Sequence, residues 1–268
     1  MKLADKVVVV TGAGSGIGRE VVLEALRRGA ALAAVDVNPT TLDETASLAA
    51  AGARLSTHVV NIMDREAVEA LPAAVTERHG TIDGIINCAG IIQPFVRLKD
   101  LDYEAIERVM AVNWSGTLYL TKTFLPLLIA RPEGHIVNVS SMGGFLPVPG
   151  QTVYGASKAA VKLFTEGLHS ECRGTSVHVT IVFPGAVATN ITANSGVAVP
   201  SMGADAEKMA SRVTPADAAA RTILDGMEKN AYRVMVGGDA KLMDLLYRVN
   251  PSGAAAFIAR QMKGLLGR

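Results

Sequence analysis

The chain has 268 residues, with 26 basic and 25 acidic side chains and a formal net charge of +1. This balance excludes the strongly basic surface typical of proteins that bind nucleic acid. Cys88 and Cys172 form no CxxC pair, so we expect reduced thiols in a cytoplasmic compartment. We expect neither a signal peptide nor a transmembrane segment, because no apolar run reaches the roughly 18 residues that spanning a bilayer requires.

Short β-branched runs alternate along the chain with longer segments of helical period. The predicted strands are 6–10, 31–36, 53–61, 82–90, 134–141, 176–185 and 232–237. The predicted helices are 17–28, 40–52, 64–80, 102–113, 115–130, 151–173 and 215–229, with two more helical stretches in the C-terminal tail. This alternation predicts an α/β fold, a doubly wound, Rossmann-like parallel sheet of about seven strands with helices on both faces.

The chain contains no linker, low-complexity tract or internal repeat, so residues 1–268 are predicted to form a single domain. We interpret 190–212 as a substrate lid and 238–268 as a C-terminal helical extension. Gly52 and Gly80 are expected to follow helix ends, and Asp64 to begin a helix.

The decapeptide TGAGSGIGRE (11–20) follows the first strand and is dense in glycine. It matches neither G-x-G-x-x-G nor the P-loop pattern. Its place at the first strand-to-helix turn nevertheless predicts a seat for a pyrophosphate, because the amides of a helix N-terminus favour negative charge. We expect Gly12 and Gly16 to provide positive φ or close backbone approach, Gly18 to allow tight helix packing, and Gly14 to be the least constrained.

Asp36 ends the second strand, at about the distance from the glycines where an acid binds the adenosine ribose. A carboxylate there accepts hydrogen bonds from the ribose hydroxyls and repels a 2′-phosphate. Neither Val37–Pro39 nor Ser15 offers a positive charge. The sequence therefore favours NAD over NADP, the alternative role for Asp36 being only to cap the next helix.

Tyr154 and Lys158 are four residues apart in a strongly helical stretch and share one face. A nearby ammonium would lower the pKa of the phenol and make it a general base. Ser140 and Ser141 end a predicted buried strand, where a hydroxyl could hold a substrate oxygen. Alone, the Tyr-x-x-x-Lys pair is a weak signal that surface helices also contain by chance.

Together these segments resemble the short-chain dehydrogenase/reductase family, in its single-domain branch. The resemblance rests on TGAGSGIG (11–18), NCAG (87–90), Asn113, Ser141, YGASK (154–158) and PGAVAT (184–189). These motifs follow the family's order and spacing over residues 6 to about 190. Each motif is weak singly, whereas the set is very specific.

The resemblance implies roles for the matching residues. Tyr154 would be the general acid/base, Lys158 would bind the nicotinamide ribose and lower the pKa of Tyr154, and Ser141 would polarise the substrate oxygen. Asn113 would kink its helix and hold a water linked to Lys158. The residues expected at the cofactor are Gly12, Ser15, Gly16, Ile17, Gly18, Asp36, Asn61, Ile62, Asn87, Ala89, Gly90, Tyr154, Lys158, Pro184, Gly185, Val187 and Thr189. We assign no metal ligand.

Two positions depart from the family's pattern. Cys88 stands where the family usually has a second Asn, and we interpret it as a small buried residue without a redox role. Asn61 stands where an Asp often contacts the adenine, and an amide can still form a hydrogen bond there.

The segments expected at the open end of the cleft are apolar and contain no basic residue to anchor a phosphate or carboxylate. This favours a small lipophilic secondary alcohol or ketone as substrate. The residues assigned to the substrate site are Phe95, Ser141, Met142, Phe145 and Gln151.

The family commonly forms dimers and tetramers, so a homodimer or homotetramer is expected. Helices 102–130 and 151–173, with Trp114, Tyr119 and Phe124, are the candidate interface. For the amphipathic C-terminal tail, packing on the domain or on a second subunit is favoured over contact with a membrane surface.

The leading hypothesis is an NAD-dependent oxidoreductase that transfers hydride between a lipophilic secondary alcohol and its ketone. One alternative is an NADP-dependent 3-oxoacyl or other ketone reductase. Another is a non-catalytic NAD-binding module, which would be expected to lack the Tyr, Lys or Ser that are all present here. A sugar-nucleotide epimerase is disfavoured because the chain has no room for a larger substrate domain.

Overall fold

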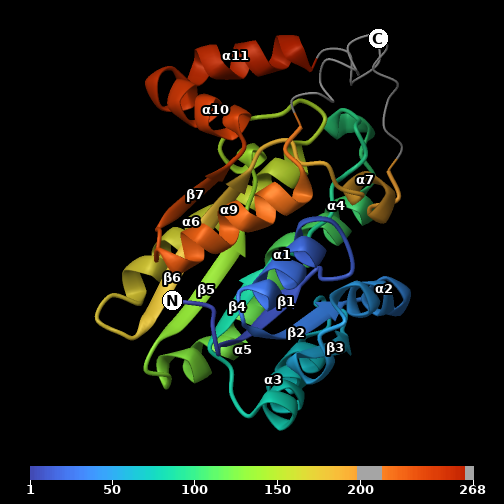
Figure 1. Ribbon diagram of the computed structural model, residues 1–268. Helices are drawn as coiled ribbons and strands as arrows, with labels where there is room; N and C mark the ends of the chain where they lie inside the picture. Colours follow the sequence, from blue (N-terminus) through green and yellow to red (C-terminus); the bar gives the residue numbers. More distant parts are fainter. Residues whose placement is uncertain (198–212, 263–268) are drawn as a thin grey trace.

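One parallel sheet of seven strands forms the centre of the computed structural model, which describes residues 1–197 and 213–262. The strand order is β3-β2-β1-β4-β5-β6-β7 (Figure 1). The strands are β1 (Val7–Thr11), β2 (Ala31–Asp36), β3 (Leu55–Val59), β4 (Gly84–Asn87), β5 (Gly134–Val139), β6 (Val177–Pro184) and β7 (Arg233–Val236). The order reverses between β1 and β4, which is where doubly wound sheets bind ligands. The predicted fold class is confirmed.

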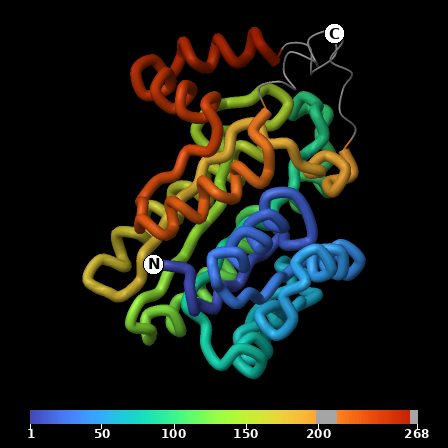
Figure 2. Tube along the Cα trace, in the orientation of Figure 1, coloured from blue at the N-terminus to red at the C-terminus, as the bar shows by residue number. Residues whose placement is uncertain are grey.

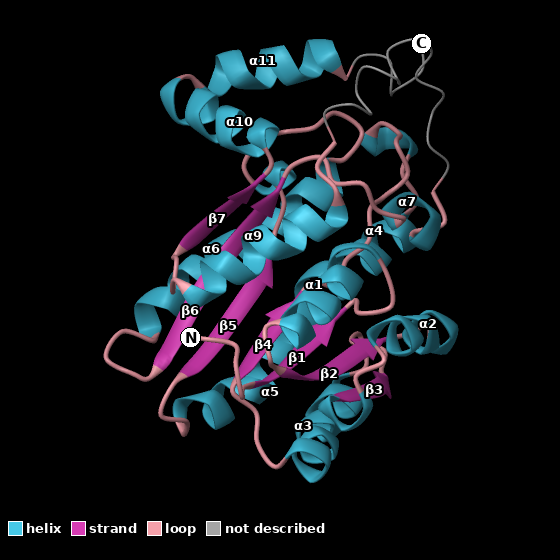
Figure 3. Ribbon diagram, viewed as in Figure 1, coloured by secondary structure: helices cyan, strands magenta, loops and turns pink. Residues whose placement is uncertain are grey.

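Helices cover both faces of this sheet (Figure 3). Side chains of α1 and α9 pack on one face, and those of α3, α5 and α6 pack on the other. The helices are α1 (Gly16–Arg27), α2 (Pro39–Ala49), α3 (Arg65–His79), α4 (Tyr103–Met110), α5 (Thr117–Ile129), α6 (Thr152–Glu171), α7 (Ile191–Asn194), α9 (Ala216–Glu228), α10 (Gly238–Val249) and α11 (Pro251–Gln261). Among the described helices, none combines the length and apolar character needed to cross a bilayer.

Of the residues expected at helix boundaries, Asp64 begins its helix as predicted and Gly52 does not directly follow the end of a helix. The Asp64 carboxylate accepts hydrogen bonds from the backbone N–H groups of Glu66 and Ala67, so it caps α3 as predicted. Gly52 does not follow the end of α2, because that helix ends at Ala49 and Ala50 takes the left-handed conformation instead. Gly52 begins a short 3₁₀ helix, η1 (Gly52–Arg54), that leads into β3.

The two helices expected at 102–113 and 115–130 are joined without a break. Between α4 and α5 the backbone widens into a π-helical segment, η3 (Ala111–Gly116). A π turn leaves the usual i to i−4 ladder and is common at functional positions. Asn113 lies within this segment and is fully buried. The irregularity expected at Asn113 is therefore present as a π turn inside one continuous helical rod.

Residues 238–261 form the helical pair α10 and α11, beyond the end of the sheet toward which the strand arrows point (Figure 3). The pair is the red part of the tube at the top of Figure 2. Met243 and Ala254 of this pair pack against Leu146, which follows β5. Residues 263–268 of the expected extension lie outside the described residues. Of the expected lid, residues 198–212 lie outside the described residues. Its first part contains α7, at the same end of the molecule.

Phe124 belongs to the core, so the prediction that it lies in a subunit interface is wrong. Its side chain is fully buried in the cluster between the sheet and α5, whereas Trp114 and Tyr119 are only partly buried. Helical period alone did not distinguish the two faces of α5, since both are apolar.

Replacing Phe124 with Ala should lower the free energy of unfolding by about 3–5 kcal/mol, because it removes buried contacts and leaves a cavity. Tyr103→Ala is the control, since Tyr103 is 82% exposed and its loss should cost within about 0.5 kcal/mol. Urea denaturation of both variants measures the difference in the free energy of unfolding, provided that this free energy falls with urea concentration at the same slope in both. Equal midpoints would contradict the core position of Phe124.

Candidate active site

The glycine loop between β1 and α1 adopts a conformation that side chains would block. Gly12 and Gly16 have φ of 69° and 53°, in the left-handed region. A Cβ on Gly12 would come within 2.9 Å of the Ala89 Cα, and one on Gly18 would meet the Gly12 carbonyl. The expected roles of these three glycines agree with the geometry: Gly12 and Gly16 turn the chain, and Gly18 lets α1 approach the loop.

Gly14 is more constrained than expected. Its backbone N–H donates to Asp36 Oδ2 at 2.9 Å, and a Cβ there would press on the Asp36 carboxylate and the Thr41 hydroxyl. The sequence pattern did not reveal this, because the constraint comes from the end of β2 and the start of α2. Asp36 thus closes the glycine loop as well as ending the strand, and its other oxygen accepts from the Asn38 N–H at 3.1 Å.

The guanidinium of Arg19 lies beside this loop, although only Ser15 and residues 37–39 were expected to set the charge around Asp36. Arg19, on the first turns of α1, donates to the Gly14 and Thr41 carbonyls and to the Thr45 hydroxyl. It also forms an ion pair with Glu44 at 2.7 Å. Arg19 thus joins α1, α2 and the loop, and its ion pair with Glu44 lies at the surface.

The N-terminus of α1 has no acidic residue in its first turn, and the Ser15 side chain makes no capping hydrogen bond there. The Ser15 hydroxyl instead accepts a hydrogen bond from Asn194 Nδ2 at 2.7 Å. Thr189 lies over the same turn, within 3.2 Å of where a Gly16 Cβ would be. The segment around α7 thus covers the helix terminus, a contact between positions 179 residues apart.

The other residues expected near the adenosine lie at the ends of β3 and β4. Asn61 and Ile62 follow β3: Asn61 is exposed and accepts from the Met63 N–H, and Ile62 is buried against Gly116. The Ala89 N–H donates to the Thr11 hydroxyl at 3.2 Å. Asn87 is buried and uses its amide Nδ2 on Asn138 and Thr121, an internal role that its place in the motif did not reveal.

Tyr154 and Lys158 lie on α6, which is fastened to the end of β5. Lys158 Nζ donates to the Val139 carbonyl at 3.0 Å, and the Lys158 carbonyl accepts from the Ser140 hydroxyl at 2.7 Å. Ser140 is therefore committed to the framework. Ser141, one residue further, accepts from the Gly143 N–H at 3.0 Å and lies close to the Tyr154 ring. This contact favours Ser141 as the serine that meets substrate.

Asn113 joins the π segment to the two neighbouring elements of the site. Its Oδ1 accepts from the Ile91 N–H at 2.9 Å, and its Nδ2 donates to the Ile91 carbonyl and the Ser157 hydroxyl, each at 3.0 Å. A Cβ on Gly90 would be 3.0 Å from Lys158 Nζ and 3.2 Å from Asn113 Oδ1. Gly90 thus leaves open the space between these two groups.

Burial controls the ionisation of these groups. It raises the pKa of the Tyr154 phenol, and hydrogen bonding with Ser141 offsets part of the rise. It also lowers the pKa of the Lys158 ammonium to about 8. Desolvation is thus the largest influence on the Tyr154 pKa in the chain alone, and the lowering expected from Lys158 stays a prediction.

Burial also raises the pKa of the Cys88 thiol to about 12. A thiol with that pKa stays protonated near neutrality and is a poor nucleophile. The Cys88 side chain is only partly buried, so it is less enclosed than the small buried residue expected, and its high pKa argues against a redox role.

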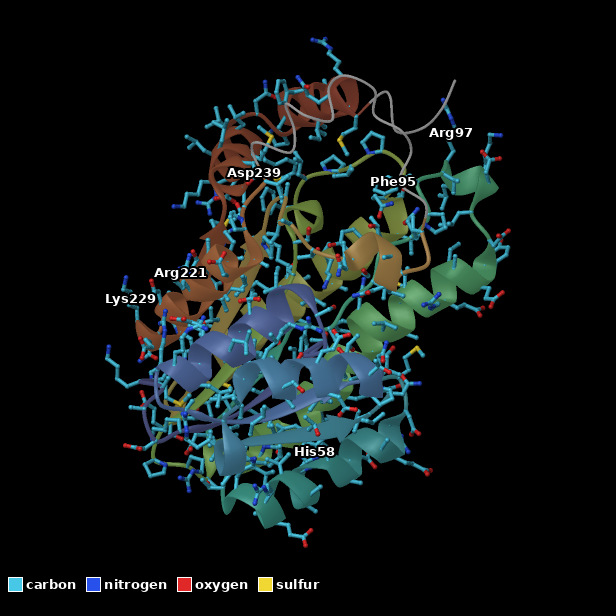
Figure 4. The ribbon with its side chains drawn as sticks, turned by 45° about the vertical axis from the view of Figure 1, so that its right-hand side comes forward. His58, Phe95, Arg97, Arg221, Lys229 and Asp239 are labelled. Atoms are coloured by element: carbon cyan, nitrogen blue, oxygen red, sulfur yellow. The ribbon has the colours of Figure 1, made fainter. Side chains whose placement is uncertain are left out.

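The loop after β6 is held by β7, by the segment before α9 and by the first turn of α10. The Gly185 N–H donates to the Val236 carbonyl at 2.9 Å, and Val187 pairs with Thr214 in an isolated bridge. The Ala186 N–H donates to Asp239 Oδ2 at 2.7 Å. Sequence analysis missed Asp239, which begins α10 and has no motif around it. Asp239 and Phe95 both lie at the end of the molecule toward which the strands run (Figure 4).

The residues assigned to the substrate site differ in packing, in exposure and in whether their polar atoms have hydrogen-bond partners. Phe145 packs against the rings of Phe183 and Tyr247, with centroids 5.5 and 6.1 Å away, and Met142 joins the same apolar group. Phe95 is partly exposed on the loop after β4. Gln151 is buried, and its Oε1 has no hydrogen-bond partner among the described residues.

Comparison with known proteins identifies the family. The model of the short chain dehydrogenase family matches residues 6–198. SadH of Mycobacterium tuberculosis is 39% identical over 263 residues, which cover 95% of this chain and 94% of that protein.

Two solved structures have the same fold. The short chain dehydrogenase/reductase of Burkholderia phymatum in complex with NAD has a TM-score of 0.84 at 26% identity, covering 94% of this chain and 96% of its own. The short chain dehydrogenase of Burkholderia cenocepacia in complex with NADP has a TM-score of 0.81 at 26% identity, covering 96% and 99%. The family expected from the motifs is confirmed, and the chain belongs to the short-chain dehydrogenase/reductase family of oxidoreductases.

Proposed function

We propose that the protein is an NAD-dependent oxidoreductase that interconverts a lipophilic secondary alcohol and its ketone. The observation that carries this proposal is the meeting of Ser141, Tyr154 and Lys158 at the carboxyl end of β5, next to the glycine loop. A bound nicotinamide would supply the chemistry of hydride transfer at its C4 position. The protein would supply position, charge and the proton.

The residues present fit a dinucleotide. Gly12 and Gly16 let the loop turn through positive φ, and Gly90 leaves open the space beside Lys158 Nζ and Asn113 Oδ1. The N-terminus of α1 has no acid to oppose a pyrophosphate. The Asp36 carboxylate is partly exposed beside this loop and would accept the ribose hydroxyls. Pro184, Gly185, Val187 and Thr189 would border the nicotinamide, at the loop that Asp239 holds.

NAD is favoured over NADP by charge. A 2′-phosphate would meet the Asp36 carboxylate, and Arg19 is already paired with Glu44. The second candidate is an NADP-dependent ketone reductase. It is kept because a related structure, 26% identical to this chain, contains NADP.

Tyr154 would transfer the proton. When a ketone is reduced, its phenol O–H would donate to the developing alkoxide, which the Ser141 hydroxyl also contacts. The raised pKa keeps the phenol protonated near neutral pH, as reduction requires. Oxidation would need the phenolate, so the chain alone favours reduction at neutral pH and oxidation at higher pH.

The surroundings of Ser141 support an apolar substrate. Met142 and Phe145 follow it directly and belong to an apolar group with α10 and α11. Segment 142–152 contains no basic residue that could anchor a phosphate or carboxylate. Phe95 and the unpartnered Oε1 of Gln151 would border the substrate, the latter accepting a hydrogen bond from it.

A homodimer or homotetramer would use the outer faces of α5 and α6. Trp114, Leu163 and Phe164 line a shallow apolar depression there, and Leu163 is 70% exposed. An apolar surface of this kind is typical of subunit contacts.

Tyr154→Phe should lower kcat by a factor of about 10²–10⁴ in both directions, because it removes the proton donor and leaves the ring in place. The rate is measured by nicotinamide absorbance with a panel of lipophilic ketones. NADH affinity, measured by calorimetry, should stay within about twofold as the control for folding. A variant with the wild-type rate on every active substrate would overturn the role of Tyr154.

Asp36→Asn should weaken the binding of NAD by roughly ten- to a hundredfold, which corresponds to the loss of one charge-assisted hydrogen bond. It should also bring the kcat/KM for NADP closer to that for NAD, since the repelling charge is gone. The amide keeps an oxygen for the Gly14 N–H and gives up only the bond from the Asn38 N–H, which is exposed and can bond to water. An unchanged cofactor preference would contradict the assignment of Asp36 to the ribose.

A further inference from the structure

The start of α6 has an unusual cap. Gln151 is its N-cap residue, yet the Gln151 side chain makes no capping hydrogen bond, and the first turn contains no acidic residue. The first N–H groups of a helix have no partner within the helix and must be satisfied from elsewhere. Here two of them belong to Val153 and to Tyr154, the proposed acid/base.

Their partner is Gln93, sixty residues earlier in the chain. Gln93 Oε1 accepts from the Val153 N–H at 2.8 Å and from the Tyr154 N–H at 2.9 Å. Its Nε2 donates to the Gly150 carbonyl at 3.0 Å, just before the helix. Gln151 Nε2 in turn donates to the Gln93 carbonyl at 2.8 Å. The Gln93 side chain is fully buried, so its amide is used entirely on the start of α6.

The neighbours of Gln93 are fixed in the same way. The Ile91 backbone is held on both sides by Asn113, and the Ile92 N–H donates to Ser195 Oγ at 3.0 Å. Three consecutive residues thus connect the π segment, the chain after α7 and the catalytic helix. The loop that carries Gln93 begins directly after the NCAG motif, so it is anchored beside the glycine loop through Thr11.

We propose that Gln93 is a positioning residue for Tyr154, capping α6 from a distant loop and fixing the phenol relative to Ser141. This inference rests on the proposed role of Tyr154. An amide suits the position, because its oxygen accepts from the Val153 and Tyr154 N–H groups while its nitrogen donates to the Gly150 carbonyl. Small displacements of a catalytic group lower the rate strongly, by up to about a hundredfold for 1 Å.

Two variants separate positioning from general stability. Gln93→Met keeps the length of the side chain but has neither the acceptor nor the donor, and its kcat should fall about ten- to a hundredfold with NADH affinity within about twofold. Gln93→Glu, which is expected to stay protonated at this fully buried position, keeps an oxygen for both N–H groups and an O–H that can donate to the Gly150 carbonyl. Its kcat should therefore recover to within about threefold of the wild type, well above that of Gln93→Met. Gln261→Met makes the same chemical change at an exposed position of α11 and should behave as wild type.

The outcomes are distinct. A folded Gln93→Met with the wild-type kcat, or a folded Gln93→Glu no more active than Gln93→Met, would overturn the proposal. If Gln93→Met does not fold, the kcat of Gln93→Glu decides alone, and a loss of about a hundredfold or more with NADH affinity kept would overturn it. Tyr154→Phe is assayed in parallel: if it is active, the proposed function fails, whereas if it is inactive and the Gln93 variants are unchanged, only the positioning role fails.

Discussion

Two hydrogen bonds fasten helix α6 to the end of strand β5, and the position of each proposed catalytic group follows from them. Lys158 reaches back to the Val139 carbonyl, and Ser140 reaches forward to the Lys158 carbonyl. They bring the Tyr154 face of the helix to Ser141 at the edge where the parallel strands end. Without this attachment, nothing would hold the Tyr154 and Lys158 face of the helix beside Ser141.

The same burial that holds Lys158 and Tyr154 also opposes their charged forms. Desolvation raises the pKa of the phenol and lowers that of the ammonium to about 8. Both directions follow from the loss of water, which the Tyr-x-x-x-Lys spacing does not reveal. That the Lys158 charge lowers the pKa of Tyr154 stays a prediction.

Local patterns predicted much of the fold. Alternating periods gave the strands, and Asp64 and the glycines at 12, 16 and 18 behave as their chemistry requires. Errors arose where a distant segment decides the outcome. Gly14 is constrained by Asp36 and Thr41, and Phe124 is buried by a sheet face that the helical period of α5 does not identify. Gln93 and Asp239 could not be found from sequence, because each acts on backbone groups more than fifty residues away.

We propose that Tyr154 would give the proton to a lipophilic ketone, whose carbonyl carbon would take the hydride that a bound nicotinamide supplies. The most direct measurement is a single-turnover reaction with NADH deuterated at the transferred position, with the product analysed by mass spectrometry. We expect deuterium on the carbinol carbon for the wild type, and at most about 1% as much from Tyr154→Phe in the same time. Equal incorporation by the two proteins, or none by the wild type across the ketone panel, would contradict the account.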